Sequence, residues 1–359
     1  MKSIKKILIG LFVLIVVCAS VVIGGYYYLI SAPSKSENKI TITVGEGQTY
    51  TSISSLLKEN NLIRNEIAYK IYLKLNPPKT LEHGKYELPT NASVEELIGI
   101  LEKGTVSSAQ TVTVKFLPGK NMRYVIKTIT ENFGYSEEEI MKVLTDQDYL
   151  DTLINKYWFL GEQIKNKDLY YSLEGYLYPD TYEFYTNASI KDIFEKLLDN
   201  MGSKVEQYKD EIEASKYNFH EILTLSSIVE LEAGSADDRK GVAGVFYNRL
   251  NSKMSLGSDV TTYYAERIDN WSRDLKQSEL DKCNNYNTRS NCLVGKLPIG
   301  PICNPSIKSL SAAIEPTNHK YYFFVADKNG KTYFNETYAK HSSTVSRLKK
   351  EGLWIEYES

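Results

Sequence analysis

Cysteine and histidine are both scarce in this chain, with four of each among 359 residues. Four cysteines are too few for the dense disulfide framework that holds small secreted domains together. Three of them, Cys283, Cys292 and Cys303, share one polar stretch, and no histidine lies close enough in sequence to complete a zinc site. Outside the cytoplasm, a Cys283–Cys292 bridge that leaves Cys303 free is one interpretation of this spacing, and unbonded thiols are the other.

Several signatures of other protein classes are also missing. No glycine-rich phosphate loop precedes a predicted helix, and there is no Gly-x-Ser-x-Gly nucleophile elbow. His220-Glu221 begins like a zinc-protease motif, but Thr224 occupies the position of the second histidine. The net charge of -2 gives no sign of a nucleic-acid partner. The sequence therefore implies no cofactor and no metal ion.

Charged side chains are absent from residues 7–30, which follow three lysines and include consecutive tyrosines from Tyr26 to Tyr28. Spanning a hydrocarbon core of ~30 Å takes about 20 apolar residues, so this stretch is long enough. The preceding lysines and the tyrosines near its end favour a cytoplasmic N-terminus. We predict a cytoplasmic tail at 1–6 and a single transmembrane helix at 7–30 in the cell membrane, with the remaining chain outside the cytoplasm. A cleaved signal peptide is the alternative, although its apolar region usually has only ~7–15 residues.

The chain beyond this helix is long enough for two domains, and its patterns predict an α+β fold class. Residues 31–39 read as a polar linker. In residues 40–105, an alternating apolar pattern from Ile40 predicts a strand, and Ser93 with Glu96 forms a capping box that opens a helix. This region is therefore predicted to be a small α+β module.

Residues 106–359 are predicted to form a larger, mixed α+β region. A strand at 112–116 leads into a mainly helical stretch, whereas the aromatic-rich segment 170–185 fits neither a simple helix nor a simple strand. Near the C-terminus, Asn329-Gly330 between two apolar runs predicts a β-hairpin.

The segment around Glu230 is the most informative for chemistry. Asn218 can cap a helix that is apolar around most of its circumference and that Gly234 can end, so this helix should be buried. A carboxyl that is partly desolvated among such neighbours can stay protonated and act as a general acid. The alternative is a structural glutamate that reaches solvent or pairs with Arg239 or Arg249.

Glu232 lies two residues beyond Glu230, and positions two apart point to nearly opposite sides of a helix. The two carboxylates should therefore not converge on one sugar ring, as a two-carboxylate glycosidase requires. Either a second acid comes from Glu174, Asp180 or Asp259, or the reaction needs only one.

A second helix is predicted directly after this segment. Ser235 and Asp238 form a capping pair that opens it. Asn248 and Arg249 end it with groups able to bind a polar ligand, and Asn248 is a candidate substrate-binding residue. Taken alone, both residues fit surface positions better than a binding site.

Six segments, taken together and in this order, resemble the endolytic murein transglycosylase family, also called YceG-like. They are residues 173–182, 227–232, 245–250, 286–288, 297–302 with 304–305, and 322–326. The resemblance covers most of the chain beyond the linker. One departure is that the family's usual Ser-Asp-Pro stands here as Ser258-Asp259-Val260, so the loop loses a rigid φ angle.

The resemblance implies roles for regions and residues. Residues 40–105 would be a LysM-like domain, a type associated with glycan binding, and residues 106–359 the transglycosylase catalytic region. Glu230 matches the family's catalytic glutamate. The resemblance also raises four further candidates for contact with the glycan: Glu174, Tyr286, Asn287 and Thr288.

The implied reaction is cleavage of the β-1,4 bond between N-acetylmuramic acid and N-acetylglucosamine inside a peptidoglycan strand, leaving a 1,6-anhydro end. The family resemblance further implies action on nascent strands, as a terminator of glycan elongation, beside penicillin-binding proteins of the elongation machinery. Two alternatives stay open at this point. One is a muramidase that hydrolyses the same bond with a second carboxylate, and the other is a non-catalytic scaffold that binds peptidoglycan.

Overall fold

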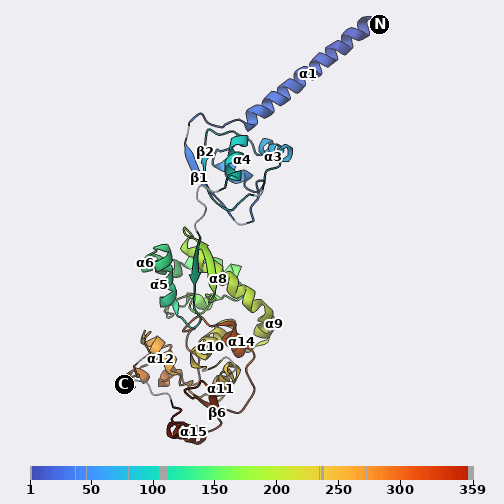
Figure 1. Cartoon of the computed structure of the whole chain (residues 1–359). Helices are drawn as coiled ribbons and strands as arrows, with labels where there is room; N and C mark the ends of the chain where they lie inside the picture. The colour runs from blue at the N-terminus through green and yellow to red at the C-terminus, as the bar shows by residue number, and fades with distance from the viewer. Residues whose placement is uncertain are drawn as a thin grey trace. The chain divides into compact units, whose positions relative to one another are not determined.

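The computed structural model describes residues 2–36, 38–45, 47–79, 81–104, 111–233, 235, 238–271 and 273–354. The chain divides into two compact units, Met1–Thr111 and Val112–Ser359, here called unit 1 and unit 2 (Figure 1). The predicted domain boundary after residue 105 falls among residues 105–110, outside the described residues. Both units mix helices with short strands, so the fold class is α+β as predicted.

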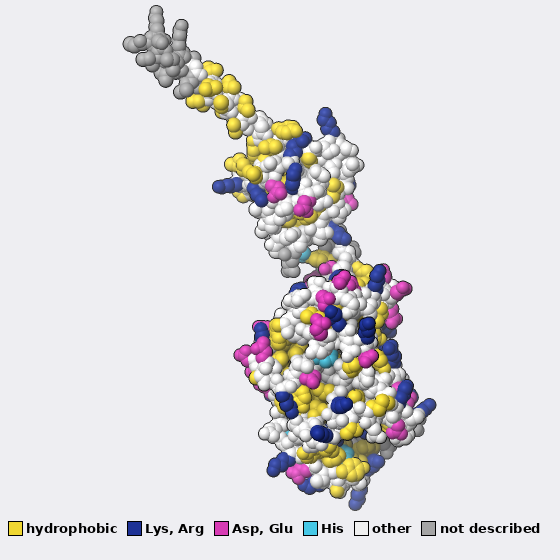
Figure 2. Space-filling view, turned by 180° about the vertical axis from the view of Figure 1, so that it is seen from behind, with side chains coloured by type: hydrophobic (Ala, Val, Ile, Leu, Met, Phe, Trp, Pro, Cys, Tyr) yellow, Lys and Arg dark blue, Asp and Glu magenta, His cyan; other side chains and the backbone are white. Residues whose placement is uncertain are grey.

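Unit 1 begins with the apolar helix α1, Lys2–Ile30. Its stretch from Phe12 to Ile30 is long and apolar enough to cross a membrane by length and composition, and none of that stretch is buried against the protein. Figure 2 shows apolar side chains along the part of this helix that is not grey. The predicted helix is therefore present, and its composition fits a membrane anchor as well as a signal sequence.

The rest of unit 1 is a small module with a hydrophobic core of its own. Its elements are β1 Lys39–Val44, α2 Ser54–Glu59, α3 Glu66–Leu75, β2 Gly84–Pro89 and α4 Val94–Glu102. Strands β1 and β2 pair antiparallel, with Ile42 opposite Tyr86. The predicted capping box is confirmed, because Ser93 and Glu96 bond each other's backbone N–H groups at the start of α4. The LysM-like character of this module stays a prediction.

The predicted linker is tied to the module at three points of its backbone. The carbonyl of Ala32 accepts a hydrogen bond of 2.7 Å from the Arg64 guanidinium. The carbonyl of Ser36 accepts one of 2.7 Å from the hydroxyl of Thr90, whose backbone N–H donates to Asn38 at 2.8 Å. A polar stretch of this kind predicts a flexible tether; the structure instead holds it against the module, because Arg64 and Thr90 satisfy its carbonyls.

Unit 2 is mainly helical and carries two small strand pairs, β3 with β4 and β5 with β6. Its first half contains β3 Thr111–Lys115, α5 Met122–Phe133, α6 Glu137–Leu144, α7 Gln147–Lys156, β4 Thr181–Tyr185, α8 Ile190–Val205 and α9 Lys209–Ala214. Its second half contains α10 Phe219–Glu232, α11 Arg239–Asn251, α12 Asp259–Ala265, α13 Gln277–Leu280, α14 Ile307–Ile314, β5 Phe323–Ala326, β6 Thr332–Asn335 and α15 Tyr338–Lys350. The predicted hairpin is confirmed, since β5 and β6 are antiparallel and flank Asn329-Gly330.

Helix α10 runs through the core of unit 2, as its all-round apolar sequence predicts. Asn218 caps it, with its side chain accepting a bond from the backbone of Glu221 and the Glu221 carboxylate bonding back. Helices α11 and α14 both pack against it. The helix ends at Glu232, and Gly234, the predicted helix stop, lies outside the described residues. Its final turn is where the buried core meets a cavity.

Candidate functional site

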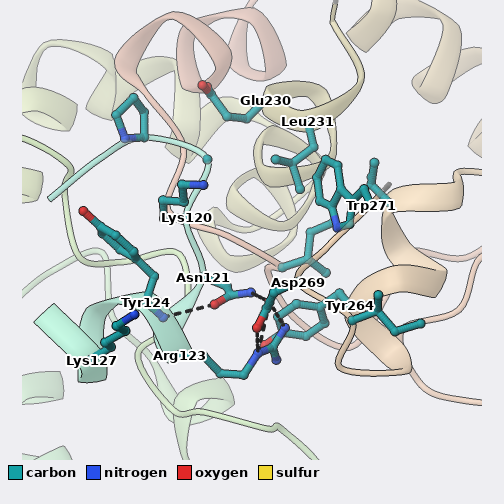
Figure 3. Close-up of a pocket in the computed structure, with 15 residues that line it drawn as sticks. Lys120, Asn121, Arg123, Tyr124, Lys127, Glu230, Leu231, Tyr264, Asp269 and Trp271 are labelled. Carbon is teal, nitrogen blue, oxygen red and sulfur yellow. Dashed lines mark hydrogen bonds and ion pairs between the residues drawn. The ribbon is translucent and has the colours of Figure 1, made fainter. Parts of the chain in front are cut away.

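A cavity of about 780 Å³ opens beside the last turn of α10 (Figure 3). Glu230 and Leu231 line it from that turn. The remaining lining comes from the loop and helix start at Pro118–Lys127, from α12, from the segment that follows α12, and from Ile302 before α14. Those residues are Pro118, Gly119, Lys120, Asn121, Arg123, Tyr124, Lys127, Val260, Tyr264, Ile268, Asp269, Trp271 and Ile302. Segments far apart in sequence therefore share one concave, mixed polar and apolar site, as ligand sites commonly do.

The Glu230 carboxylate is held at the start of helix α14. Its Oε2 accepts two hydrogen bonds from Ser306, one from the backbone N–H at 3.0 Å and one from the hydroxyl at 2.6 Å. Ser306 is the N-cap of α14, so the positive end of that helix dipole also faces the carboxylate. The other oxygen, Oε1, lies 3.6 Å from the guanidinium of Arg239, and the Glu230 side chain is 8% exposed. These contacts fix its orientation while it still lines the cavity.

The sequence left two interpretations of Glu230, and its role as a general acid stays a prediction. The pairing with Arg239 exists, whereas Arg249 turns away and donates to the backbone carbonyls of Leu256 and Tyr322. Arg239 is itself anchored, because its Nε donates to the Ser309 hydroxyl of α14 at 2.7 Å. Glu230 is thus a positioned, nearly buried carboxylate at a cavity wall, which is the arrangement an acid/base catalyst needs.

Gly119, in the loop beside this carboxylate, has the left-handed backbone that favours glycine. Gly119 has a φ of +73°, and a Cβ at this position would lie 3.5 Å from the Leu231 side chain and 3.7 Å from that of Glu230. Its N–H donates to the carbonyl of Asn304 at 2.9 Å, and the N–H of Asn304 donates to the carbonyl of Lys120 at 2.9 Å. The loop is thereby fastened over the end of α10.

The wall opposite Glu230 contains a second carboxylate, which a guanidinium clamps. Arg123 donates from Nε to Asp269 Oδ2 at 2.9 Å and from Nη2 to Oδ1 at 2.6 Å, and Asn121 adds a bond of 2.8 Å to Oδ1. The bond from Arg123 is the main cause that lowers the pKa of Asp269 below its usual value. Figure 3 shows this pair on one side of the cavity and Glu230 on the other. Asp269 is therefore a charged carboxylate, and both of its oxygens accept bonds from Arg123.

The aromatic side of the cavity is formed by Trp271 and Tyr264. Trp271 is 38% exposed and stacks on Tyr263, with ring centroids 5.7 Å apart. Tyr264 is buried beneath the guanidinium of Arg123, which lies 5.4 Å from its ring centroid. An exposed, backed indole beside polar groups is a suitable surface for an apolar sugar face.

Glu174, a predicted substrate-binding residue, lies beneath the cavity and is 2% exposed. Its Oε2 accepts bonds from the backbone N–H of Met122 at 2.9 Å and from the hydroxyl of Tyr264 at 3.0 Å. Burial is the main cause that raises the pKa of Glu174 from 4.5 to about 7. In this conformation Glu174 supports the start of α5 and the Tyr264 wall, and its contact with a glycan stays a prediction.

The predicted triplet Tyr286, Asn287 and Thr288 is also inside the protein, with at most 1% of each residue exposed. Asn287 accepts a bond of 2.7 Å from the Thr262 hydroxyl of α12, and the Thr288 hydroxyl contacts that of Thr261 at 2.8 Å. The triplet therefore braces helix α12, which supplies Val260 and Tyr264 to the cavity. Direct contact between these three side chains and a glycan stays a prediction, and it requires a movement that exposes them.

Asn248 is engaged at the end of α11, away from the lining of the cavity. Its amide donates to the carbonyls of His319 at 2.8 Å and Tyr321 at 2.9 Å. It thereby fastens the segment that leads into β5 onto α11. Its predicted role in binding substrate is likewise left as a prediction.

Glu232 turns away from Glu230, as the helix geometry predicts. Its Oε1 accepts a short bond from the Ser258 hydroxyl, and burial raises the pKa of Glu232. The other acids considered from the sequence are also occupied elsewhere: Asp180 bonds Thr181 and Asn200, and Asp259 pairs with Arg289 at 3.3 Å. Among the described residues, the cavity is lined by two carboxylates, Glu230 and Asp269.

Several segments identified in the sequence converge on the frame of this site. Asn304 accepts a bond from the backbone of Leu177 at 3.1 Å, and Ile302 donates to the Ser227 hydroxyl of α10 at 3.0 Å. His220 of α10 contacts the Tyr176 hydroxyl at 2.8 Å, and burial lowers the pKa of His220. The segments 173–182 and 297–305 are therefore bound to α10, whose last turn carries Glu230.

The structure shows which of the three clustered cysteines are bonded. Cys283 and Cys292 form a disulfide, so the bridge interpretation is confirmed, and Cys303 is free and buried. The bridge closes the loop that carries residues 286–288. Cys303 lies beside α10, with its thiol donating to the carbonyl of Ser227 at 3.3 Å.

Sequence reasoning missed Lys120, Arg123, Asp269 and Trp271 as cavity residues. Arg123 and Asp269 are 146 positions apart, and neither lies in a motif with a recognisable spacing. The only local signal was Asn121, which caps α5 and so places Arg123 in its first turn.

The burial of Glu174 predicts a specific dependence of stability on pH. Because its folded-state pKa of about 7 exceeds the usual 4.5, the folded protein holds this proton where the unfolded chain has lost it. Stability should therefore fall as the pH rises from about 4.5 to about 7, by about 3 kcal/mol. Glu174→Gln cannot ionise, so its melting temperature should fall less across this range. Thermal melts of the detergent-solubilised chain measure this.

The control for this prediction is Asp259→Asn, which removes an exposed carboxylate whose side chain is 59% accessible. That variant should keep the pH dependence of the wild type. A Glu174→Gln curve that parallels the wild-type curve would show that Glu174 is ionised in the folded protein at low pH and would reject this assignment.

Comparisons with known proteins agree with the resemblance found in the sequence. The YceG-like family model matches residues 42–347. The endolytic murein transglycosylase of Bacillus subtilis strain 168 is 31% identical over 91% of this chain and 91% of its own. The one of Streptococcus pneumoniae D39 is 29% identical over 90% of this chain and 61% of its own. A crystal structure of a yceG-like protein from Listeria monocytogenes superposes with a TM-score of 0.60 at 31% identity, covering 86% of this chain and all of that one. The chain belongs to the YceG-like family.

Proposed function

We propose that this protein is a membrane-anchored endolytic transglycosylase of peptidoglycan, in which Glu230 is the only acid/base catalyst. The names of its relatives supply the substrate class and the type of reaction. The observation that carries the assignment is the difference between the two cavity carboxylates. Asp269 is held in a bidentate clamp by Arg123, whereas Glu230 Oε1 keeps only a looser contact of 3.6 Å with Arg239.

One carboxyl group is sufficient for this reaction. Glu230 in its protonated form gives its proton to the glycosidic oxygen, and the bond from that oxygen to C1 of the muramic acid residue breaks. The resulting carboxylate then removes the proton of the muramic 6-hydroxyl, whose oxygen attacks C1 and closes the 1,6-anhydro ring. No water is consumed, and the proton returns to Glu230. Ser306 and Arg239 stabilise the carboxylate that exists between these two transfers.

A muramidase that hydrolyses the same bond is the alternative that one observation favours. Such an enzyme needs a second carboxylate to assist water or to act as nucleophile. Asp269 lines the same cavity as Glu230 and is the available candidate. Against this role, both of its oxygens already accept hydrogen bonds from Arg123. The third sequence-based alternative, a non-catalytic scaffold, predicts binding to strands without any product.

The variant Asp269→Asn separates the two enzymatic proposals. In the transglycosylase, the single amide oxygen of asparagine can still accept bonds from Arg123 and Asn121 although the second bond from Arg123 is lost, so cleavage should fall less than about tenfold. A group that acts as general acid or base contributes about 10²–10⁴-fold. If the cleavage rate of Asp269→Asn fell by that factor while the melting temperature stayed unchanged, Asp269 would have a catalytic role, and the muramidase would be favoured. The measurement is the rate of product formation from purified glycan strands.

We further propose that α1 spans the cell membrane, with the N-terminus in the cytoplasm and the chain beyond α1 outside it. An enzyme tethered in this way meets glycan strands near the membrane, where these strands are made. It would therefore act as a terminator of glycan elongation, and penicillin-binding proteins of the elongation machinery are the expected partners. The apolar composition of Phe12–Ile30 and the lysines before it support this topology.

A further inference from the structure

Helix α3 of unit 1 exposes an apolar stripe that the core does not use. Ile67, Ile71 and Leu75 are 70%, 45% and 67% exposed, and their spacing of four residues places them along one side of the helix. The opposite side is buried in the module through Ala68, Tyr69 and Leu73. A helix on the surface of a water-soluble protein normally carries polar residues on its outer face. This stripe therefore needs an apolar environment from outside the module.

The charged residues on the same helix fit a membrane surface. Lys70 and Lys74 are exposed and flank the stripe, while Glu66 is paired with Lys70 at 3.4 Å and accepts a bond from Ser54. Basic residues around an exposed apolar face are typical of helices that lie in the plane of a bilayer interface. Long lysine side chains can keep their ammonium groups at the headgroups while their methylene chains cover apolar surface.

The position of α3 relative to α1 identifies the bilayer as the occupant of this face. The guanidinium of Arg64, two residues before α3, lies 4.6 Å from the ring centroid of Tyr28 and donates to its hydroxyl at 3.3 Å. It also holds the carbonyl of Ala32. Ile30, the last residue of α1, packs against the core of the module. Helices α1 and α3 are thus in contact at the end of the apolar span.

This contact sets the depth of α3. If Phe12–Ile30 spans the hydrocarbon core, Tyr28 and Ile30 lie at its outer boundary, where tyrosines are enriched. The headgroup layer beyond that boundary is only about 5–7 Å thick on each side, whereas a helix with its side chains is about 10–12 Å across. Any helix that touches these residues must therefore lie within or directly on the headgroup layer. The three bonds that tie the linker to the module prevent it from swinging away.

We propose that α3 is a second membrane contact. Its side chains Ile67, Ile71 and Leu75 insert at the boundary between headgroups and acyl chains in the outer leaflet. The inference rests on the proposed membrane anchor and extends it. A single spanning helix would leave the module free to tilt and rotate. Two contacts fix the orientation of the module, so that the module presents a constant face to the membrane.

The test uses the full-length chain in vesicles of phosphatidylcholine and phosphatidylglycerol in equal parts. An environment-sensitive fluorophore is attached at Ile71→Cys after Cys18→Ala and Cys303→Ala remove the free thiols. The matched control is Thr43→Cys, an exposed position of β1, which lies on the other side of α4 from α3 (Figure 1). Lipids with brominated chains should quench the label at residue 71 several-fold more strongly than the label at residue 43.

Equal, weak lipid quenching at both positions would overturn the proposal. So would a label at residue 71 that is shielded from a water-soluble quencher but not reached by the brominated lipids, because a protein would then cover the face. Replacing Ile67 and Leu75 by asparagine should reduce the quenching at residue 71, because the apolar side chains that insert the helix are then lost. These positions are so exposed that the fold should be unaffected.

A separate label on the native Cys18 reports on the anchor, since this residue is within the predicted span. Quenching at Cys18 without quenching at residue 71 would retain the anchor and reject the α3 contact. Quenching at residue 71 without quenching at Cys18 would support the α3 contact and reject the spanning anchor. The two proposals therefore fail independently.

Discussion

Replacing Glu230 by glutamine should stop glycan cleavage while the protein still folds and binds strands. Glutamine has nearly the same shape, and its amide oxygen can accept the two bonds from Ser306. It cannot give a proton to the glycosidic oxygen or remove one from the 6-hydroxyl. Because one group performs both transfers in this proposal, the rate should fall by at least about 10²–10⁴-fold. Product formation from purified strands and the melting temperature are the two measurements.

Glu232→Gln is the matched control for this variant. It makes the same chemical change two residues along the same helix, but its carboxylate bonds the Ser258 hydroxyl and does not line the cavity. This variant should keep cleavage close to that of the wild type. Anhydro-ended products from Glu230→Gln at a comparable rate would remove Glu230 from its catalytic role.

Substituting alanine for Gly175 should destabilise unit 2 by about 2–5 kcal/mol. Gly175 has a φ of +86°, and left-handed backbone costs other residues roughly 1–2 kcal/mol. An added Cβ would also collide with the ring of Pro301, coming within 2.7 Å of its Cγ, and overpacking of this kind typically costs about 1–3 kcal/mol. The collision would push segment 173–182 away from the wall formed by residues 297–305. Thermal melts should therefore show a lower melting temperature, and cleavage should fall with it.

Gly134→Ala separates the two causes. Gly134 has a similar φ of +76° at the end of α5, but a Cβ there would meet nothing within 4 Å. It should therefore show only the backbone cost of roughly 1–2 kcal/mol. If both alanine variants melted at the same temperature, the contact between Gly175 and Pro301 would have no energetic importance, and this account of the site frame would be wrong.

Local features of the fold could be predicted because their causes are local. The capping groups of Ser93 and Asn218 act within one helical turn, and Asn329-Gly330 fits a tight turn between two strands. The burial of α10 follows from its apolar circumference, and the opposed directions of Glu230 and Glu232 follow from helix geometry alone. The catalytic candidate and the exclusion of its neighbour were therefore accessible from the sequence.

The rest of the site depends on contacts between distant segments. Arg123 and Asp269 meet only because α5 and the segment after α12 fold together, and no spacing in the sequence encodes that meeting. The segment 170–185, which fitted no regular element, contains the left-handed turn at Gly175 and then strand β4. The motif residues Tyr286 to Thr288 marked an important loop, but only the structure shows that they brace α12 from inside.

The central claim is that one carboxylate, Glu230, cleaves the strand with the substrate's own hydroxyl as nucleophile. Mass spectrometry of the products from purified, uncrosslinked glycan strands digested by the full-length chain tests it most directly. The account predicts fragments that end in 1,6-anhydro-N-acetylmuramic acid, with no water added. Fragments with reducing ends, each one water heavier, would contradict it and identify the enzyme as a hydrolysing muramidase.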